Sequence, residues 1–252
     1  MEVFCVTNLK GGVGKTITAV NTAYLLSVFH GRVLLIDNDK QGNNSKFFGV
    51  WSEDVLSPSI STVLTERNFD ISKAIQRTKY ECLDVLPANM SLLKANKDIL
   101  LDCSRPQQSR LQKALKEVGD LYDYVVIDCA PDINMSVINA LVASDEVIIP
   151  LKIDKFSFDG LDQLREQIED IREFNKSIHI AGCLVTMFTQ NSVNKQGAEE
   201  LRRSFGLPVF KSMIRKTVKV DETTFVGTPL QAYAPKCSAA KDYMDFVKEL
   251  IQ

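Results

Sequence analysis

The sequence lacks a strong excess of charge of either sign and any long hydrophobic stretch. Its 252 residues carry a formal net charge of −2, which argues against a protein that coats nucleic acid over its whole surface. No apolar run reaches the roughly 18 residues that a membrane-spanning helix needs, and the first residues lack the basic region and apolar core of a secretory signal. These absences favour a cytoplasmic protein with, at most, a local basic patch.

The sequence also lacks Cys-x-x-Cys pairs, internal repeats, low-complexity segments and linkers. Six widely scattered cysteines are present: Cys5, Cys82, Cys103, Cys129, Cys183 and Cys237. We expect them to be buried, reduced thiols rather than a disulfide framework or a metal site. With 45% apolar and 25% charged residues, the chain is long enough for one large α/β domain over residues 1–252.

Strand and helix patterns alternate along the chain. Short apolar runs predict strands at 3–6, 32–37, 83–87, 124–128, 146–150 and 178–185. Helices are predicted directly after the first strand and its glycine-rich loop, and near 60–64, 71–76, 92–102, 107–118, 135–143, 159–174, 193–205 and 238–251. This alternation predicts a single doubly wound, mostly parallel sheet with helices on both faces.

A glycine-rich loop joins the first predicted strand to the first predicted helix. It reads Lys10-Gly11-Gly12-Val13-Gly14-Lys15-Thr16. The three glycines let several backbone N–H groups point at one anion, and the start of the helix adds its positive end. Lys15 can then reach the β and γ phosphates of a nucleotide, and the Thr16 hydroxyl can ligate Mg²⁺. A glycine turn with two solvated lysines is the alternative, and the flanking strand and helix argue against it.

Two of the apolar strands end in aspartates, which a nucleotide-hydrolysing site requires beside its phosphate loop. Asp128 follows three apolar residues and is predicted to hold Mg²⁺, with an acidic strand-end cap as the alternative. Asp37 and Asp39 lie two residues apart, so on an extended backbone they face the same side.

The glycine-rich loop departs from the usual Gly-x4-Gly-Lys-Ser/Thr pattern at Leu9 and carries a second lysine, Lys10, five residues before Lys15. It resembles the deviant Walker A motif of the P-loop NTPase family that contains ParA/Soj, MinD and the nitrogenase iron protein. The resemblance continues over residues 37–43, where Lys40 replaces a proline, and over 138–150, 160–164 and 207–233. It covers essentially the whole chain without an additional N-terminal DNA-binding domain, as in the Soj-like branch.

The resemblance implies ATP and Mg²⁺ as cofactors and assigns roles to the residues that match. Lys10, Lys15 and Asp39 are the implied catalytic residues. Lys10 crosses a dimer interface to the partner's nucleotide and Asp39 orients the attacking water. Asp37 joins Thr16 and Asp128 around the metal. The implied nucleotide contacts are Lys10, Gly11, Gly12, Val13, Gly14, Lys15, Thr16, Ile17, Met187, Arg215 and Lys216. At the last two, Arg215-Lys216-Thr217 replaces the family's Pro-Arg-Asn.

Residues 195–219 are strongly basic, with seven Lys or Arg against two Glu, whereas the rest of the chain has a net charge of −7. Such asymmetry favours a cation-lined face that neutralises DNA phosphates without reading bases; a solvated helix face with scattered lysines is the alternative. The candidate DNA contacts are Lys195, Arg202, Arg203, Arg215, Lys216 and Lys219. Lys219 matches a basic position of Soj, whereas Asn191 stands where Soj-like proteins carry an arginine.

The resemblance therefore implies a partition ATPase for plasmid or chromosome segregation. ATP and Mg²⁺ would drive a homodimer that binds DNA nonspecifically, and slow hydrolysis stimulated by a ParB-like partner would release it. The protein would be cytoplasmic, and associated with the nucleoid when ATP is bound. A MinD-like membrane switch is an alternative, but the tail at 241–252 is charge-balanced and suits packing on the sheet. An iron–sulfur protein is disfavoured because Met135 occupies the position of the family's cluster cysteine.

Overall fold

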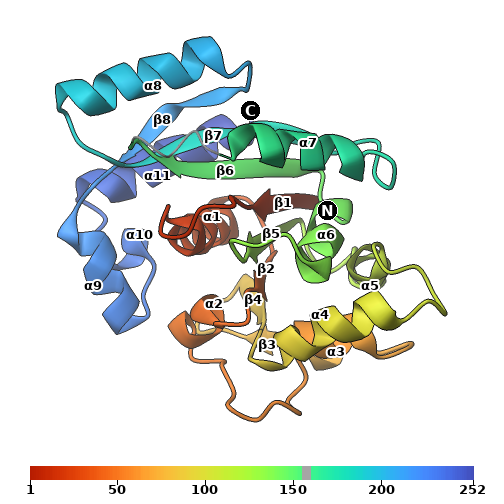
Figure 1. The fold of residues 1–252 in the computed structure, drawn as a ribbon. Helices are drawn as coiled ribbons and strands as arrows, with labels where there is room; N and C mark the ends of the chain where they lie inside the picture. The colour runs from red at the N-terminus through yellow and green to blue at the C-terminus, as the bar shows by residue number, and fades with distance from the viewer. Residues whose placement is uncertain (155–159) are drawn as a thin grey trace.

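The computed structural model describes residues 1–154 and 160–252 (Figure 1). The strands are β1 (Glu2–Val6), β2 (Val33–Asn38), β3 (Gln76–Arg77), β4 (Leu83–Leu86), β5 (Tyr124–Cys129), β6 (Glu146–Lys152), β7 (His179–Phe188) and β8 (Val209–Arg215). The α-helices are α1 (Lys15–Phe29), α2 (Asn43–Phe47), α3 (Ile60–Thr65), α4 (Ser91–Leu101), α5 (Arg110–Glu117), α6 (Met135–Val142), α7 (Leu161–Ile171), α8 (Ser192–Ser204), α9 (Val218–Val226), α10 (Leu230–Tyr233) and α11 (Ser238–Leu250).

In the described part of the chain the strands form a single sheet in the order β3-β4-β2-β5-β1-β6-β7-β8. All neighbouring strands run parallel except β3, which pairs antiparallel with β4 at one edge. The predicted doubly wound, mostly parallel sheet is confirmed. Because parallel strands end at the same edge, the segments after β1, β2, β5 and β6 meet there.

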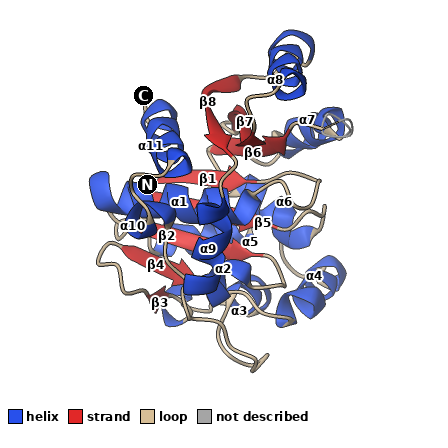
Figure 2. Cartoon of the chain, turned by 90° about the vertical axis from the view of Figure 1, so that its left-hand side faces the viewer, coloured by secondary structure: helices blue, strands red, loops and turns tan. Residues whose placement is uncertain are grey.

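Helices cover both faces of the sheet (Figures 1 and 2). Alternate residues of β1 serve the two cores: Phe4 and Val6 pack with α1 and α11, whereas Val3 and Cys5 pack with the layer that contains α4 to α7. Strands buried on both faces read as continuous apolar runs, which explains why their positions were evident in the sequence.

The C-terminal helix α11 belongs to this core. Its apolar side chains, including Tyr243, Phe246 and Val247, are buried in the layer formed with α1. The tail therefore packs on the sheet as its charge balance predicted. In the two described ranges, we find no helix with the length and apolar character needed to span a bilayer.

The structure corrects the helix predicted at 71–76. A 3₁₀ turn covers Ile71–Lys73 only, because the Asp70 carboxylate accepts hydrogen bonds from the backbone and side chain of Ser72 and closes a short turn. Gln76 and Arg77 then pair with β4 as β3. The elements α2, β8, α9 and α10 were not predicted as such. The first residue of the helix predicted at 159–174 lies outside the described residues, and α7 begins at Leu161.

The six cysteines are all free thiols. Cys5, Cys129 and Cys183 are buried, but Cys82 and Cys237 are half-buried and Cys103 is exposed. The expectation that all are buried was wrong for these three. Cys103 follows the end of α4 in a surface turn, where no packed layer covers it.

Candidate nucleotide-binding site

The phosphate loop lies between the end of β1 and the start of α1. Gly12 and Gly14 have φ values of 71° and 86°, a conformation that strains other residues. A Cβ atom at Gly11 or Gly12 would meet no other atom within 4 Å, so the loop borders open space. The Lys15 side chain is buried, its Nζ donates a hydrogen bond to the Lys10 carbonyl oxygen at 2.9 Å, and burial lowers its pKa while Asp128 acts in the opposite direction. This geometry suits a bound anion.

Two buried aspartates lie on adjacent strands beside this loop. Asp37 and Asp128 are register partners in β2 and β5, and both are almost fully buried. Burial raises the pKa of Asp37 to about 6. Burial, and secondly the charge of Asp37, raise the pKa of Asp128 well above its ordinary value. Two like charges side by side in the protein interior favour a site that is completed by a cation.

The unprotonated form of each aspartate is supported by the beginning of α2. Ser45 donates to Asp37 Oδ2 from its backbone N at 2.8 Å and from its hydroxyl at 2.7 Å, and Asn44 Nδ2 donates to Asp128 Oδ2 at 2.9 Å. Neither Asn44 nor Ser45 was singled out in the sequence, although both directly follow the family-like segment 37–43. They fix the orientation of the two carboxylates.

The arrangement fits Mg²⁺. Asp128 Oδ1 is buried and has no hydrogen-bond partner in the described part of the chain, so it is a carboxylate oxygen available to a hard cation. The Thr16 hydroxyl lies close enough to lower the pKa of Asp128. Residues 1–154 and 160–252 contain no group of three or more His, Cys, Asp or Glu side chains able to hold a metal. Thr16, phosphate oxygens and water would therefore have to complete the shell.

Asp39 lies in a turn and not on the strand. Because β2 ends at Asn38, the extended backbone that we expected to continue through Asp39 stops one residue before it. Asp39 Oδ1 accepts a hydrogen bond from the Gln41 backbone N at 2.9 Å, and its own backbone N donates to Asp37 Oδ1 at 3.3 Å. Lys40 Nζ lies 3.9 Å from Asp132 Oδ2. This contact links the turn after β2 to the turn after β5.

Lys10 forms an ion pair within its own chain. Its Nζ lies 2.6 Å from Asp154 Oδ1, and about one third of each side chain is exposed (31% and 33%). Asp154 follows β6, so the pair joins two turns at the same edge of the sheet. Asp154 was not identified from the sequence.

A small pocket beside the phosphate loop brings together residues from distant parts of the chain. The predicted nucleotide contacts Gly14, Ile17, Met187, Arg215 and Lys216 all line this cavity of about 80 Å³. Thr186, Ile214, Thr217, Val220, Asp221 and Tyr243 complete its lining.

Two features fix the walls of this pocket. Met187 has a φ of 51°, which is uncommon for a residue other than glycine, and the neighbouring Thr186 hydroxyl donates to the Val13 carbonyl oxygen at 2.8 Å. Asp242 of α11 binds Arg215 through both the backbone N (2.9 Å) and the guanidinium (2.6 Å). Asp242 was not identified from the sequence either.

The predicted DNA contacts lie on several elements. Lys195, Arg202 and Arg203 belong to α8, Arg215 ends β8, Lys216 follows it, and Lys219 belongs to α9; α8 and α9 lie well apart (Figures 1 and 2). Part of their charge is paired within the chain. Arg203 contacts Glu199, Arg215 contacts Asp242 and Lys219 contacts Glu222. Lys195 and Lys216 form no ion pair with any described residue.

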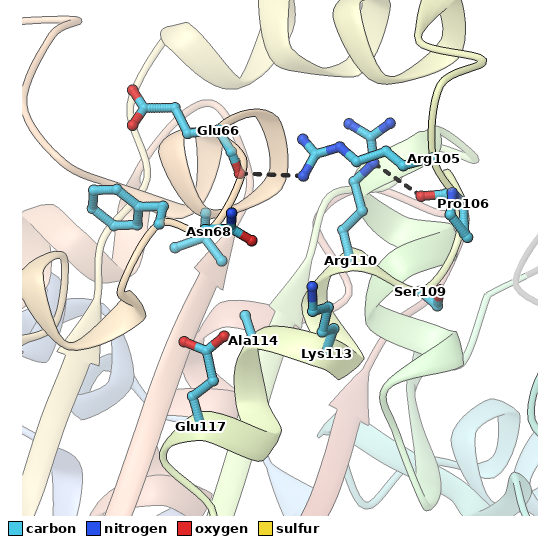
Figure 3. A pocket seen from close by; sticks show the side chains of 11 residues that line it. Glu66, Asn68, Arg105, Pro106, Ser109, Arg110, Lys113, Ala114 and Glu117 are labelled. Atoms are coloured by element: carbon cyan, nitrogen blue, oxygen red, sulfur yellow. Dashed lines mark hydrogen bonds between the residues drawn. The ribbon is translucent and has the colours of Figure 1, made fainter.

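A second pocket, of about 140 Å³, lies between the end of α3 and the start of α5 and shares no residue with the first (Figure 3). The arginines that line this pocket form hydrogen bonds and ion pairs within the chain. Arg105 donates to the Glu66 carbonyl oxygen and Arg110 to that of Pro106, and both guanidiniums contact Asp102. Both arginines also donate to the Leu64 carbonyl oxygen, which lies at the C-terminal end of α3. We therefore assign this cluster a structural role.

Comparison with known proteins agrees with this geometry. Residues 1–180 match a family model described as an AAA domain. The chain is 36% identical to the sporulation initiation inhibitor protein Soj of Bacillus subtilis, over 99% of this chain and 98% of that protein. It is 34% identical to the chromosome partitioning protein ParA of Caulobacter vibrioides, over 100% of this chain and 94% of that protein.

Solved structures of nucleotide-bound proteins are also similar to this chain. A cobyrinic acid a,c-diamide synthase from Mycobacterium smegmatis, with a bound ATP analogue and magnesium, superposes with a TM-score of 0.86 at 27% identity, covering 100% of this chain and 94% of that one. A Borrelia burgdorferi B31 protein described as a plasmid partition protein, bound to AMPPNP, superposes with a TM-score of 0.81 at 26% identity, covering 99% and 98%. The chain therefore belongs to the ParA/Soj family of P-loop ATPases.

Proposed function

We propose that this protein is a partition ATPase that uses ATP and Mg²⁺ to switch between a monomer and a DNA-binding dimer, and that residues 1–252 act as one ATPase domain. One observation carries the proposal: a phosphate loop with two lysines meets two buried carboxylates at one edge of the sheet. The relatives Soj and ParA, and the partition-protein structure with AMPPNP, support the same assignment.

In the proposed reaction, the triphosphate lies on the backbone N–H groups of the loop and at the start of α1, and Lys15 neutralises the β and γ phosphate oxygens. Thr16, Asp37 and Asp128 would hold Mg²⁺, which would supply positive charge against the charge that develops on these phosphates. Asp39 orients a water molecule toward the γ phosphorus. The water oxygen bonds to phosphorus as the bond to the bridging oxygen breaks, which yields ADP and phosphate.

Dimerisation is assigned to Lys10. In the single chain its amine is held by Asp154; in the proposed dimer it leaves this carboxylate and binds the nucleotide of the partner subunit. The ion pair is partly exposed, so the energy needed to break it is small compared with that of binding a triphosphate. Slow hydrolysis, accelerated by a ParB-like partner, would return the protein to the monomer.

The proposed dimer binds DNA through the basic residues of α8, the end of β8 and α9. Contacts of Lys and Arg with phosphates need no base readout and weaken as salt rises. The proposed protein is cytoplasmic and associates with the nucleoid when ATP is bound. In this account Lys219 exchanges its partner Glu222 for a DNA phosphate.

The test of the DNA-binding step is a gel shift on nonspecific duplex DNA at low salt. We expect binding with ATP and Mg²⁺ but not with ADP. A Lys219→Glu variant should bind DNA at least about 10-fold more weakly, because a cation at a phosphate is replaced by an anion. Lys176→Glu is the matched control, since Lys176 lies outside the basic stretch. DNA binding that is equal with ATP and ADP, or a Lys219→Glu variant with the DNA affinity of the parent, would contradict the proposed DNA-binding step.

A further inference from the structure

Trp51 is the only tryptophan in the chain and lies in the loop that joins α2 to α3 (Figure 1). The edge of its indole ring packs directly on Gly42. A Cβ atom at Gly42 would lie 2.6 Å from Trp51 Cδ1 and 2.8 Å from Nε1, and Gly42 also has a φ of +62°. Only glycine satisfies both conditions. The indole ring therefore occupies the space that a side chain at position 42 would need.

Two further observations describe the surroundings of the indole. Lys46 Nζ lies 4.8 Å from the centre of the ring, within the range of a cation–π contact. The indole Nε1–H is buried and has no hydrogen-bond partner in the described part of the chain. A buried donor without a partner is uncommon in native proteins.

The groups that Trp51 contacts hold the turn that carries Asp39. The Gly42 backbone N donates to the Asp39 carbonyl oxygen at 2.9 Å, and Lys46 Nζ donates to the Gln41 carbonyl oxygen at 2.7 Å. Gly42 also directly precedes α2, whose residues Asn44 and Ser45 donate hydrogen bonds to Asp128 and Asp37. The indole thus contacts Gly42 and Lys46, and each of these two residues donates a hydrogen bond to the turn.

We propose that Trp51 is a positioning residue for hydrolysis, which holds the turn 39–42 so that the Asp39 carboxylate stays aligned for the attacking water. The inference rests on the function proposed above for Asp39. Trp51 does not line the phosphate loop or the pocket beside it. It acts on the alignment of the reaction and not on nucleotide affinity, and small misalignments of reacting groups are costly in rate.

The test compares Trp51→Ala and Trp51→Phe with the parent in steady-state ATP hydrolysis and in binding of a fluorescent ATP analogue. Trp51→Ala should lower kcat about 10-fold, in the range found for groups that orient catalytic residues, with nucleotide affinity unchanged. Trp51→Phe keeps an aromatic ring on Gly42 and should recover most of the rate. Leu56→Ala, which changes an 85% exposed side chain of the same loop, should match the parent.

An Asp39→Ala background separates positioning from a general structural role. If Trp51 acts through Asp39, adding Trp51→Ala to Asp39→Ala should cause no further loss of rate. The inference would be overturned by a further loss of rate in the double variant. It would also be overturned if Trp51→Ala melts as the parent does and keeps the parental kcat, or if it loses nucleotide affinity as much as it loses rate. If Asp39→Ala alone hydrolyses ATP at the parental rate, the proposed role of Asp39 fails, and this inference fails with it.

Discussion

The two ends of the candidate nucleotide site are built in different ways. At the phosphate end, Asp37 and Asp128 lie at the ends of adjacent central strands and are held by the beginning of α2, and Lys15 is held by the loop that follows β1. At the other end, where we propose that the base of the nucleotide binds (the base end), one pocket collects residues from α1, β7, β8, α9 and α11, and its wall at Arg215 is fixed by Asp242. The phosphate end is therefore built from segments that directly follow central strands, and the base end from side chains of five separate elements.

If the comparison holds, the largest loss should come from the phosphate end. Lys15→Ala removes the buried amine that faces the phosphates, and we expect hydrolysis to fall about 100- to 1000-fold, as for the loss of one donor to developing charge. Single-turnover hydrolysis measures this, and a thermal melt checks that the variant is folded. A rate within 10-fold of the parent would show that the loop is a solvated glycine turn.

A smaller effect is expected from the residues that orient the metal carboxylates. Asn44→Ala removes the donor to Asp128 Oδ2, and we expect the apparent affinity for Mg²⁺ to fall about 10-fold or more. A titration of hydrolysis against Mg²⁺ concentration measures it. Asn175→Ala is the matched control, because that asparagine donates instead to the Ser144 backbone carbonyl oxygen and precedes β7 at the opposite edge of the sheet. Equal behaviour of the two variants would contradict the role of Asn44.

The smallest effect is expected at the base end. Asp242→Ala releases both the backbone and the guanidinium of Arg215. We expect the KM for ATP to rise about 3- to 10-fold while kcat stays unchanged, because this interaction stabilises the bound substrate and the transition state equally. Asp245→Ala is the control, since Asp245 lies on the same helix, pairs with Lys248 at 4.0 Å and makes no hydrogen bond to Arg215 among the described residues. A loss of kcat at constant KM would show that the two ends do not act separately.

The same contrast explains what could be predicted from the sequence. The central strands and the glycine loop were evident because buried parallel strands read as apolar runs and the loop requires glycines at fixed positions. Asp37 and Asp128 were recognisable as acids at strand ends. Asp154 follows β6 in the same manner, so the same rule applied to a third strand would have identified the partner of Lys10.

The elements that were missed depend on distant partners. The strand β8 contains Lys211 and Ser212, which interrupt its apolar pattern, and Glu249 of α11 accepts hydrogen bonds from both backbone N–H groups at 2.6 and 3.0 Å. This contact satisfies the free edge of the sheet. No local pattern could reveal it, because Glu249 lies 37 residues beyond Ser212. The pairing of Arg215 with Asp242 was hidden in the same way.

The proposed switch depends on the Lys10 amine leaving Asp154 and binding the nucleotide of the partner subunit. Light scattering coupled to size-exclusion chromatography tests this most directly. The Asp39→Ala protein, which should retain ATP, is expected to elute with Mg²⁺ and ATP at twice the 28.2 kDa of one chain, and with ADP as a monomer. Adding Lys10→Ala should keep it monomeric in ATP. A dimer that forms equally well without the Lys10 amine, or no dimer in any nucleotide, would contradict the account.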